Sequence, residues 1–295
     1  MLEDISPEAA GLCRKRLQRI TRWMERQVEL QRLPGISVLV QRHGRIGYFE
    51  AVGQRDVEAG LPLTADTMFR IYSMTKPITS VALMTLYEEG LFQLDDPLAK
   101  FLPAFERMQV LTGGDADNPQ LEPARELITI RQLLTHTAGL TYGFMHATPV
   151  DALYRKHKIV FPGAKEPLAA IVDRLATLPL LAHPGNIWSY SVATDVLGRL
   201  IEVISGQPFD RFLHQRIFEP LGMVDTGFHV PPEKLDRFAV LYGPPGSEGM
   251  GLQPTRAPNE LRPEPQPGLK LLDPRDGTFA KPPVAPSGCG GLVST

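Results

Sequence analysis

The pattern of apolar and polar residues over the first ninety positions predicts helix, strand, strand, helix. Residues 6–28 carry apolar side chains at mostly helical spacing behind a start signal of serine, proline and acid, and a following Pro-Gly pair ends the helix. The runs 36–41 and 45–52 are rich in β-forming residues and flank a short Arg-His-Gly turn, which predicts a hairpin. Residues 73–89 return to helical spacing, with Gly90 as the C-cap.

The middle of the chain reads as a mostly helical region inserted after these strands. Between residues 95 and 223 no convincing strand alternation stands out. The predicted short helices cover residues 130–134, 167–176, 191–204 and 209–218.

The last part of the chain changes in composition. Residues 243–291 are rich in proline and glycine, which predicts a long irregular loop because proline denies the backbone both helix and ladder hydrogen bonds. A disordered linker is the alternative interpretation. We therefore expect three regions: residues 1–90 with the first strands and a helix, 91–223 mostly helical, and 224–295 a loop with an incomplete return to the sheet.

Composition favours an ordinary globular protein. The chain has 295 residues, 43% of them hydrophobic, a formal net charge of −2 and no run of like charge, so no nucleic-acid partner is expected. The first five residues hold acids where a secretory signal needs bases, and no apolar stretch approaches the ~20 residues of a membrane span. We expect a cytoplasmic protein with no membrane partner.

Metal and cofactor chemistry is not expected. Cys13 and Cys289 have no neighbouring cysteine or histidine, which predicts two free thiols. The seven histidines show neither H-x-H nor H-E-x-x-H spacing. No resident metal or cofactor is therefore predicted.

Ser73 and Lys76 form the one S-x-x-K motif of the sequence, at the start of a predicted helix. A spacing of three residues brings two helical side chains to one face, so the lysine can hydrogen-bond the serine hydroxyl. A serine hydroxyl is a weak nucleophile until a neighbouring group takes its proton, and the helix N-terminus adds exposed N–H groups nearby. By itself the motif is weak, since about one such spacing arises by chance in a chain of this size.

Tyr190 lies at a predicted loop-to-helix junction and is the second candidate. A phenol held in a cleft can accept a proton from a serine and return it to a leaving group. A buried tyrosine with a satisfied hydroxyl is the commoner case, so the interest of Tyr190 depends on Ser73 and Lys76. His136 is interpreted as a structural hydrogen-bonding residue, because the serine already has two partners.

These motifs belong to a wider resemblance that runs over nearly the whole chain. The sequence resembles the class C β-lactamases and, most closely, the related family VIII carboxylesterases. The matching segments, in family order, are FRIYSMTKP at 69–77, LLTHTAGL at 133–140, PGNIWSYS at 184–191, PLGM at 220–223 and GGLVST at 290–295.

The resemblance implies a fold and a set of site residues. The fold is α+β, an antiparallel sheet flanked by helices with an inserted, mostly helical domain and the active site between them. The nucleophile would be Ser73, its lysine Lys76 and the general base Tyr190, with the Ser73 N–H as half of an oxyanion hole. Tyr142 corresponds to a pocket aromatic of some of the esterases.

Two departures from the family pattern affect the expected activity. Val192 stands where β-lactamases usually place an asparagine that holds the lactam side chain, so an esterase is favoured. The third motif, K-T-G, H-x-G or W-x-G on a strand, has no counterpart; His183-Pro184-Gly185 fits only by coincidence, in a turn. The chain thus resembles a C-terminally truncated member, with an open sheet edge, half an oxyanion hole and low activity if it ends at Thr295.

The expected function is hydrolysis of small or short-chain esters through an acyl-enzyme on Ser73, with a small-molecule ester as the partner. β-Lactamase, D-aminopeptidase and acyltransferase chemistry of the same superfamily are alternatives that share the serine and lysine. A catalytically incomplete relative that keeps the fold for binding is the alternative outside enzymes.

Overall fold

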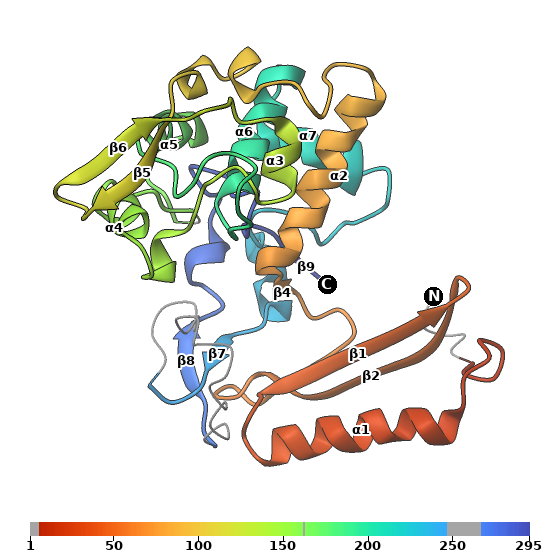
Figure 1. Cartoon of the computed structure of the whole chain (residues 1–295). Coiled ribbons are helices and arrows are strands. Elements are labelled where there is room, and N and C mark those ends of the chain that lie inside the picture. The colour runs from red at the N-terminus through yellow and green to blue at the C-terminus, as the bar shows by residue number, and fades with distance from the viewer. Residues whose placement is uncertain (1–5, 162, 247–266) are drawn as a thin grey trace. The chain divides into compact units, whose positions relative to one another are not determined.

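A computed structural model describes residues 6–161, 163–246 and 267–295. The chain divides into two compact units (Figure 1). The first, here called the sheet unit, comprises residues 1–69, 230–280 and 295. The second, the helical unit, comprises residues 70–229 and 281–294.

The sheet unit opens with the predicted helix and hairpin. Helix α1 (Arg14–Glu29) runs along one face of the antiparallel strands β1 (Gly35–Arg42) and β2 (Arg45–Asp56), as Figure 1 shows. His43 and Gly44 both take positive φ, at 50° and 75°, which is the two-residue turn whose twist suits a hairpin. The hairpin prediction is confirmed.

The predicted start of the first helix at Ser6 is wrong. Residues 7–11 form a turn, Gly11 has a left-handed φ of 69°, and Cys13 is extended at the N-cap of α1. A left-handed residue followed by an extended one interrupts the helical backbone, so α1 begins only at Arg14.

Three short strands complete the sheet unit. β3 (Leu61–Pro62) pairs with β2, and β7 (Leu241–Gly243) pairs antiparallel with β8 (Lys270–Asp273). Strand β8 interrupts the irregular loop predicted for residues 243–291, so that prediction is wrong at residues 270–273. The described residues 244–246 and 274–291 hold no strand or α-helix beyond the 3₁₀ turn at Thr278–Ala280, and residues 247–266 lie outside the described part of the chain.

The helical unit contains most of the helices. Helix α2 (Thr75–Glu88) follows a 3₁₀ turn at Tyr72–Met74, and the short strand β9 (Val293–Ser294) lies in the same unit. The short strand β4 (Phe69–Arg70) holds the last residue of one segment of the sheet unit and the first residue of the helical unit. The remaining helices are α3 (Ile130–Leu134), α4 (Pro149–Lys156), α5 (Leu168–Leu175), α6 (Ala193–Ser205) and α7 (Phe209–Leu213), the last continued by a π turn at His214–Phe218. The four predicted short helices are confirmed within a few residues at each end.

Two elements of the helical unit escaped the sequence pattern. β5 (Gln109–Gly114) and β6 (Pro119–Pro123) form an antiparallel hairpin, so the expectation of no strand between residues 95 and 223 is wrong. Two glycines in β5 and two prolines in β6 give these strands a composition typical of loops. Helix α4 also went unpredicted, although Thr148 and Asp151 form its capping box.

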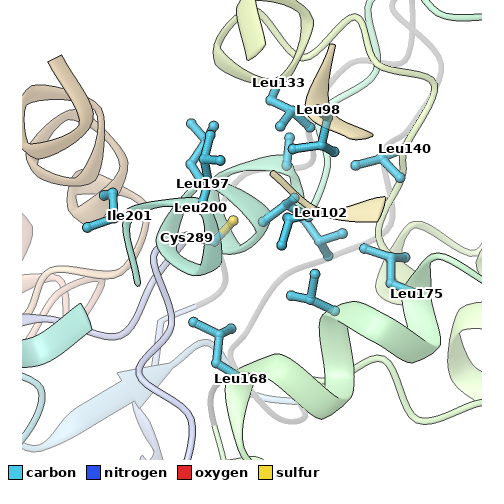
Figure 2. Packing of buried hydrophobic residues seen from close by; sticks show 14 of the residues in the cluster. Leu98, Leu102, Leu133, Leu140, Leu168, Leu175, Leu197, Leu200, Ile201 and Cys289 are labelled. Atoms are coloured by element: carbon cyan, nitrogen blue, oxygen red, sulfur yellow. The ribbon is translucent and has the colours of Figure 1, made fainter. Parts of the chain in front are cut away.

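The apolar core of the helical unit is built around α6. Leu197, Leu200 and Ile201 of this helix are fully buried (Figure 2). Helices α2, α3, α5 and α7 all pack against α6. Gly198 lets the Phe209 ring approach closely, since a Cβ at that position would lie 3.1 Å from the ring. The first two turns of α6 are thus buried among the neighbouring helices.

The fold is α+β, as expected. No helix in the described part of the chain is both long and apolar enough to cross a membrane.

Candidate active site

Ser73 lies in the 3₁₀ turn Tyr72–Met74 that leads into α2. The preceding residue, Tyr72, has a φ of 41°, a left-handed conformation that is uncommon for a residue with a side chain. Ser73 itself is exposed, whereas Thr75 is fully buried and its hydroxyl accepts a hydrogen bond from the Leu292 N–H at 3.2 Å. The serine is therefore presented to solvent at the tip of an anchored turn.

Lys76 reaches back to Ser73 from the first turn of α2. Its Nζ donates to Ser73 Oγ at 3.3 Å and to the Cys289 carbonyl at 2.8 Å. The same Nζ lies 4.6 Å from the centre of the Tyr190 ring. The predicted serine and lysine pair is thus in contact, and the Cys289 carbonyl gives the amine a second hydrogen-bond partner.

Tyr190 comes to the same point from the loop before α6. Its hydroxyl donates to Ser73 Oγ at 2.7 Å, across 117 residues of sequence. Two backbone hydrogen bonds fasten this loop to the turn after α3, from Ser189 N–H to the His136 carbonyl and from Gly185 N–H to the Thr137 carbonyl, each at 2.8 Å. The three predicted residues therefore converge on one oxygen, Ser73 Oγ.

His136 supports this loop. It has a left-handed φ of 56°, its Nδ1 shares a hydrogen bond of 3.2 Å with Ser191 Oγ, and its ring centre lies 5.1 Å from that of Tyr190. Burial, helped by the positive charge of Lys76, lowers the pKa of His136 to about 4. The ring is therefore neutral at neutral pH, in keeping with a structural role.

Aromatic rings line one side of the three converging residues. Tyr142 is 9% exposed, its ring centre lies 5.3 Å from that of Tyr190, and it stacks on Phe144 at 4.6 Å. Burial raises the pKa of the Tyr142 hydroxyl far above its ordinary value, so it stays protonated. Trp188 is 67% exposed and lies nearly parallel to Tyr190 at 6.4 Å. Sequence reasoning found Tyr142 but missed Phe144 and Trp188.

Val192 is placed differently from the other predicted residues. It is the N-cap of α6, its N–H donates to the Thr141 carbonyl at 3.2 Å, and its side chain is 2% exposed within the apolar core. Its proposed contact with substrate stays a prediction.

Sequence reasoning also missed a buried polar group beneath Lys76, made by Asp195, Ser287 and Cys289. Asp195 Oδ1 accepts from Ser287 Oγ at 2.7 Å and from the Cys289 N–H at 3.0 Å. The aspartate interrupts the otherwise apolar face of α6, which is the only sign of it in the sequence. Both cysteines are free thiols, as predicted, with Cys13 exposed and Cys289 buried.

No group of three or more His, Cys, Asp or Glu side chains among the described residues is placed to hold a metal ion.

An S-x-x-K serine on a helix start, a tyrosine facing it and an α+β fold are features of the β-lactamase and transpeptidase class of folds. The family model described as "Beta-lactamase" matches residues 20–295. The chain belongs to this family.

Several relatives are esterases or acyl-transfer enzymes by name. The chain is 39% identical over 216 residues to Esterase EstB of Burkholderia gladioli, covering 72% of this chain and 51% of that protein. It is 33% identical over 221 residues to the monacolin J acid methylbutanoyltransferase of Aspergillus terreus, covering 72% and 52%. The solved structure of EstCE1, "a hydrolase with promiscuous acyltransferase activity", matches with a TM-score of 0.74 and 30% identity over 94% of this chain and 68% of that one. The chain thus spans about half the length of these two curated relatives.

Proposed function

We propose that the protein is a serine carboxylesterase that hydrolyses small or short-chain esters through an acyl-enzyme on Ser73. The observation that carries the proposal is the convergence on Ser73 Oγ, which lies 2.7 Å from the Tyr190 hydroxyl and 3.3 Å from Lys76 Nζ. The tyrosine distance is within the range for direct proton transfer, the lysine distance lies at its edge, and the serine is exposed to an incoming substrate.

The reaction proceeds in two balanced halves. The reactive form is the one in which the pair of Lys76 and Tyr190 has lost one proton and can accept another. Ser73 Oγ attacks the ester carbonyl while its proton passes to this pair, and the pair returns that proton to the departing alkoxide. Water then attacks the acyl-enzyme, gives one proton to the same pair, and releases the acid as Ser73 Oγ is reprotonated. The Ser73 N–H, at the start of its turn, would donate to the oxyanion in both halves.

Acyl transfer is the second candidate, and the names of the relatives favour it. In this reaction an alcohol takes the place of water against the same acyl-enzyme, so Ser73, Lys76 and Tyr190 keep their roles. The exposed Trp188 beside Tyr190 offers an apolar surface on which an organic alcohol could compete with water.

β-Lactam hydrolysis is the less favoured use of the site. The position that carries an asparagine amide in the β-lactamases holds Val192, whose side chain is apolar and buried. It cannot donate a hydrogen bond to a lactam side chain.

The test is a set of initial rates on 4-nitrophenyl acetate and butyrate and on a chromogenic cephalosporin, with Ser73→Ala as the matched control. We expect ester turnover that Ser73→Ala reduces to background, and little or no cephalosporin turnover. Adding a primary alcohol and measuring the transesterified product separates hydrolysis from acyl transfer. Ester turnover that survives in Ser73→Ala, or a cephalosporin rate above the ester rates, would reject the proposal.

A further inference from the structure

Asp195 is a carboxylate in an unusual place. It lies in the first turn of α6, it is 0% exposed, and its neighbours along the helix are the apolar side chains of the core. Burial raises the pKa of Asp195, and the hydrogen bonds that it accepts from the 287–289 turn act in the opposite direction. Burying a carboxylate is costly unless hydrogen bonds compensate it.

Asp195 accepts hydrogen bonds from the turn at residues 287–289. Oδ1 receives hydrogen bonds from the Ser287 hydroxyl and from the Cys289 N–H, at 2.7 and 3.0 Å. The Ser287 hydroxyl in turn accepts from the Gly290 N–H at 3.2 Å. One carboxylate oxygen therefore ties together both ends of the turn.

Helices α2 and α6 clamp the same turn from two sides. A Cβ on Gly288 would lie 2.4 Å from the Thr194 carbonyl, so only glycine fits against α6. From α2, the Thr79 hydroxyl donates to the Gly288 carbonyl at 2.9 Å. The turn has little freedom while these contacts are in place.

The turn ends on the carbonyl that receives Lys76. The Cys289 N–H points to Asp195, and the Cys289 carbonyl accepts from Lys76 Nζ at 2.8 Å. Since the N–H and the carbonyl belong to the same residue, fixing the one restricts where the other can lie. The amine is then held 3.3 Å from Ser73 Oγ.

We infer that Asp195 is a positioning residue for Lys76, acting through the 287–289 turn and the Cys289 carbonyl that receives the amine. The inference rests on the proposed function for its effect on turnover, but the placement of the amine can be measured without turnover. The position of Lys76 depends on the hydrogen bonds that Asp195 Oδ1 accepts from Ser287 and Cys289.

The experiment compares three substitutions with a matched control. Asp195→Ala removes the oxygen that accepts both hydrogen bonds, Asp195→Asn keeps an acceptor oxygen in nearly the same volume, and Ser287→Ala removes one donor. The control is Asp151→Ala in α4, another buried carboxylate, which accepts from the Thr141 and Thr148 hydroxyls and does not contact the turn.

Turnover is measured on 4-nitrophenyl butyrate as separate kcat and KM values. We expect Asp195→Ala to lower kcat by about 100-fold with KM within about twofold, because a displaced proton-handling group slows chemistry more than binding. Asp195→Asn restores most of that loss, to within about fivefold of the parent, and Ser287→Ala lies between them. In a Lys76→Ala background, Asp195→Ala causes little further loss, since the two act through one path.

Placement of the amine is measured by limited acetylation with acetic anhydride and peptide mass spectrometry. We expect the Lys76 acetylation rate, relative to that of Lys100 in the same chain, to rise severalfold in Asp195→Ala and to stay unchanged in Asp151→Ala. An unchanged Lys76 rate in folded Asp195→Ala and Ser287→Ala would overturn the inference. So would an equal loss of kcat in Asp195→Asn and Asp195→Ala, or a loss confined to KM.

The two proposals fail in different ways. If the parent protein shows no ester turnover, but Asp195→Ala still raises the Lys76 acetylation rate, the esterase is rejected and the positioning of the amine is supported. A parent protein that hydrolyses esters, with Lys76 acetylation and kcat both insensitive to Asp195→Ala, keeps the esterase and rejects the positioning.

Discussion

The helical unit and the sheet unit differ in how much apolar packing each contains within itself. In the helical unit a continuous apolar core joins α2 to α7 with the 285–292 segment, and α6 alone contributes five buried apolar residues to it. In the sheet unit the long helix α1 buries only Met24, and the adjacent Trp23 is 54% exposed.

The residues of the candidate site lie in the unit with the more extensive apolar core. Ser73, Lys76, Tyr190 and Asp195 all belong to the helical unit, where close packing fixes the elements that carry them. A site that depends on contacts of about 3 Å needs such a frame, because small displacements of a reacting group are costly. Substitutions in the two units should therefore differ in kind, and the following measurements test that contrast.

Removal of the amine should have the largest effect. Lys76→Ala takes away a group that touches Ser73 Oγ, and we expect kcat to fall by about 10³-fold with the free energy of unfolding little changed. Kinetics on 4-nitrophenyl butyrate and urea unfolding of the same sample measure both. A loss of folding in place of turnover would mean that the lysine serves the core and not the chemistry.

A matched pair of leucines tests the packing contrast directly. Leu200→Ala in α6 empties a fully buried site and should cost about 3 kcal/mol in the free energy of unfolding. Leu39→Ala in β1, where the side chain is 50% exposed, should cost less than about 1 kcal/mol. Equal losses in denaturant unfolding would remove the distinction between the units.

The role of the Tyr190 hydroxyl can be tested separately from that of its ring. Tyr190→Phe deletes the hydrogen bond of 2.7 Å to Ser73 Oγ and keeps the ring against Tyr142 and Lys76, so we expect kcat to fall about 100-fold. The melting temperature is the control and should change little. Turnover close to normal would remove the phenol from the proposed mechanism.

The smallest expected effect is the pH dependence due to His136. Its folded pKa of about 4 lies below the ordinary value of 6.5, so the unfolded chain binds the proton more readily and stability falls as the pH drops from about 6.5 to 4. Because the ring is only partly buried, solvent screening limits the loss to about 1 kcal/mol.

Unfolding free energies between pH 7 and 4, compared with His136→Asn, measure this dependence. Asparagine tolerates the left-handed backbone of this position and carries no titrating ring. The pH-dependent part of the difference between the two proteins should grow as the pH falls. A difference that does not vary with pH would exclude the histidine as its cause.

Local signals allowed much of the fold to be predicted. The hairpin at His43 and Gly44 and the helices α3 and α6 follow from turn chemistry and periodicity, both of which act over a few residues. β5 and β6 could not be found this way, because their glycines and prolines are typical of loops and the pairing between the strands forms the hairpin.

The candidate site was predictable only in part, for a similar reason. Ser73, Lys76 and Tyr190 were found through the motifs that carry the family resemblance. Asp195 was not found, because its importance depends on Cys289, which lies 94 residues further along the chain. The exposed Trp188 was missed because no local pattern marks a ring that lies beside a site.

The most direct test of the central claim is to map the residue that an active-site fluorophosphonate modifies. Intact protein is treated with the probe, digested, and analysed by peptide mass spectrometry, with Ser73→Ala alongside. We expect one adduct, on the peptide that contains Ser73, which is absent in Ser73→Ala and forms more slowly in Lys76→Ala. An adduct on another serine, or no adduct on folded protein that hydrolyses esters, would contradict the claim that Ser73 is the nucleophile.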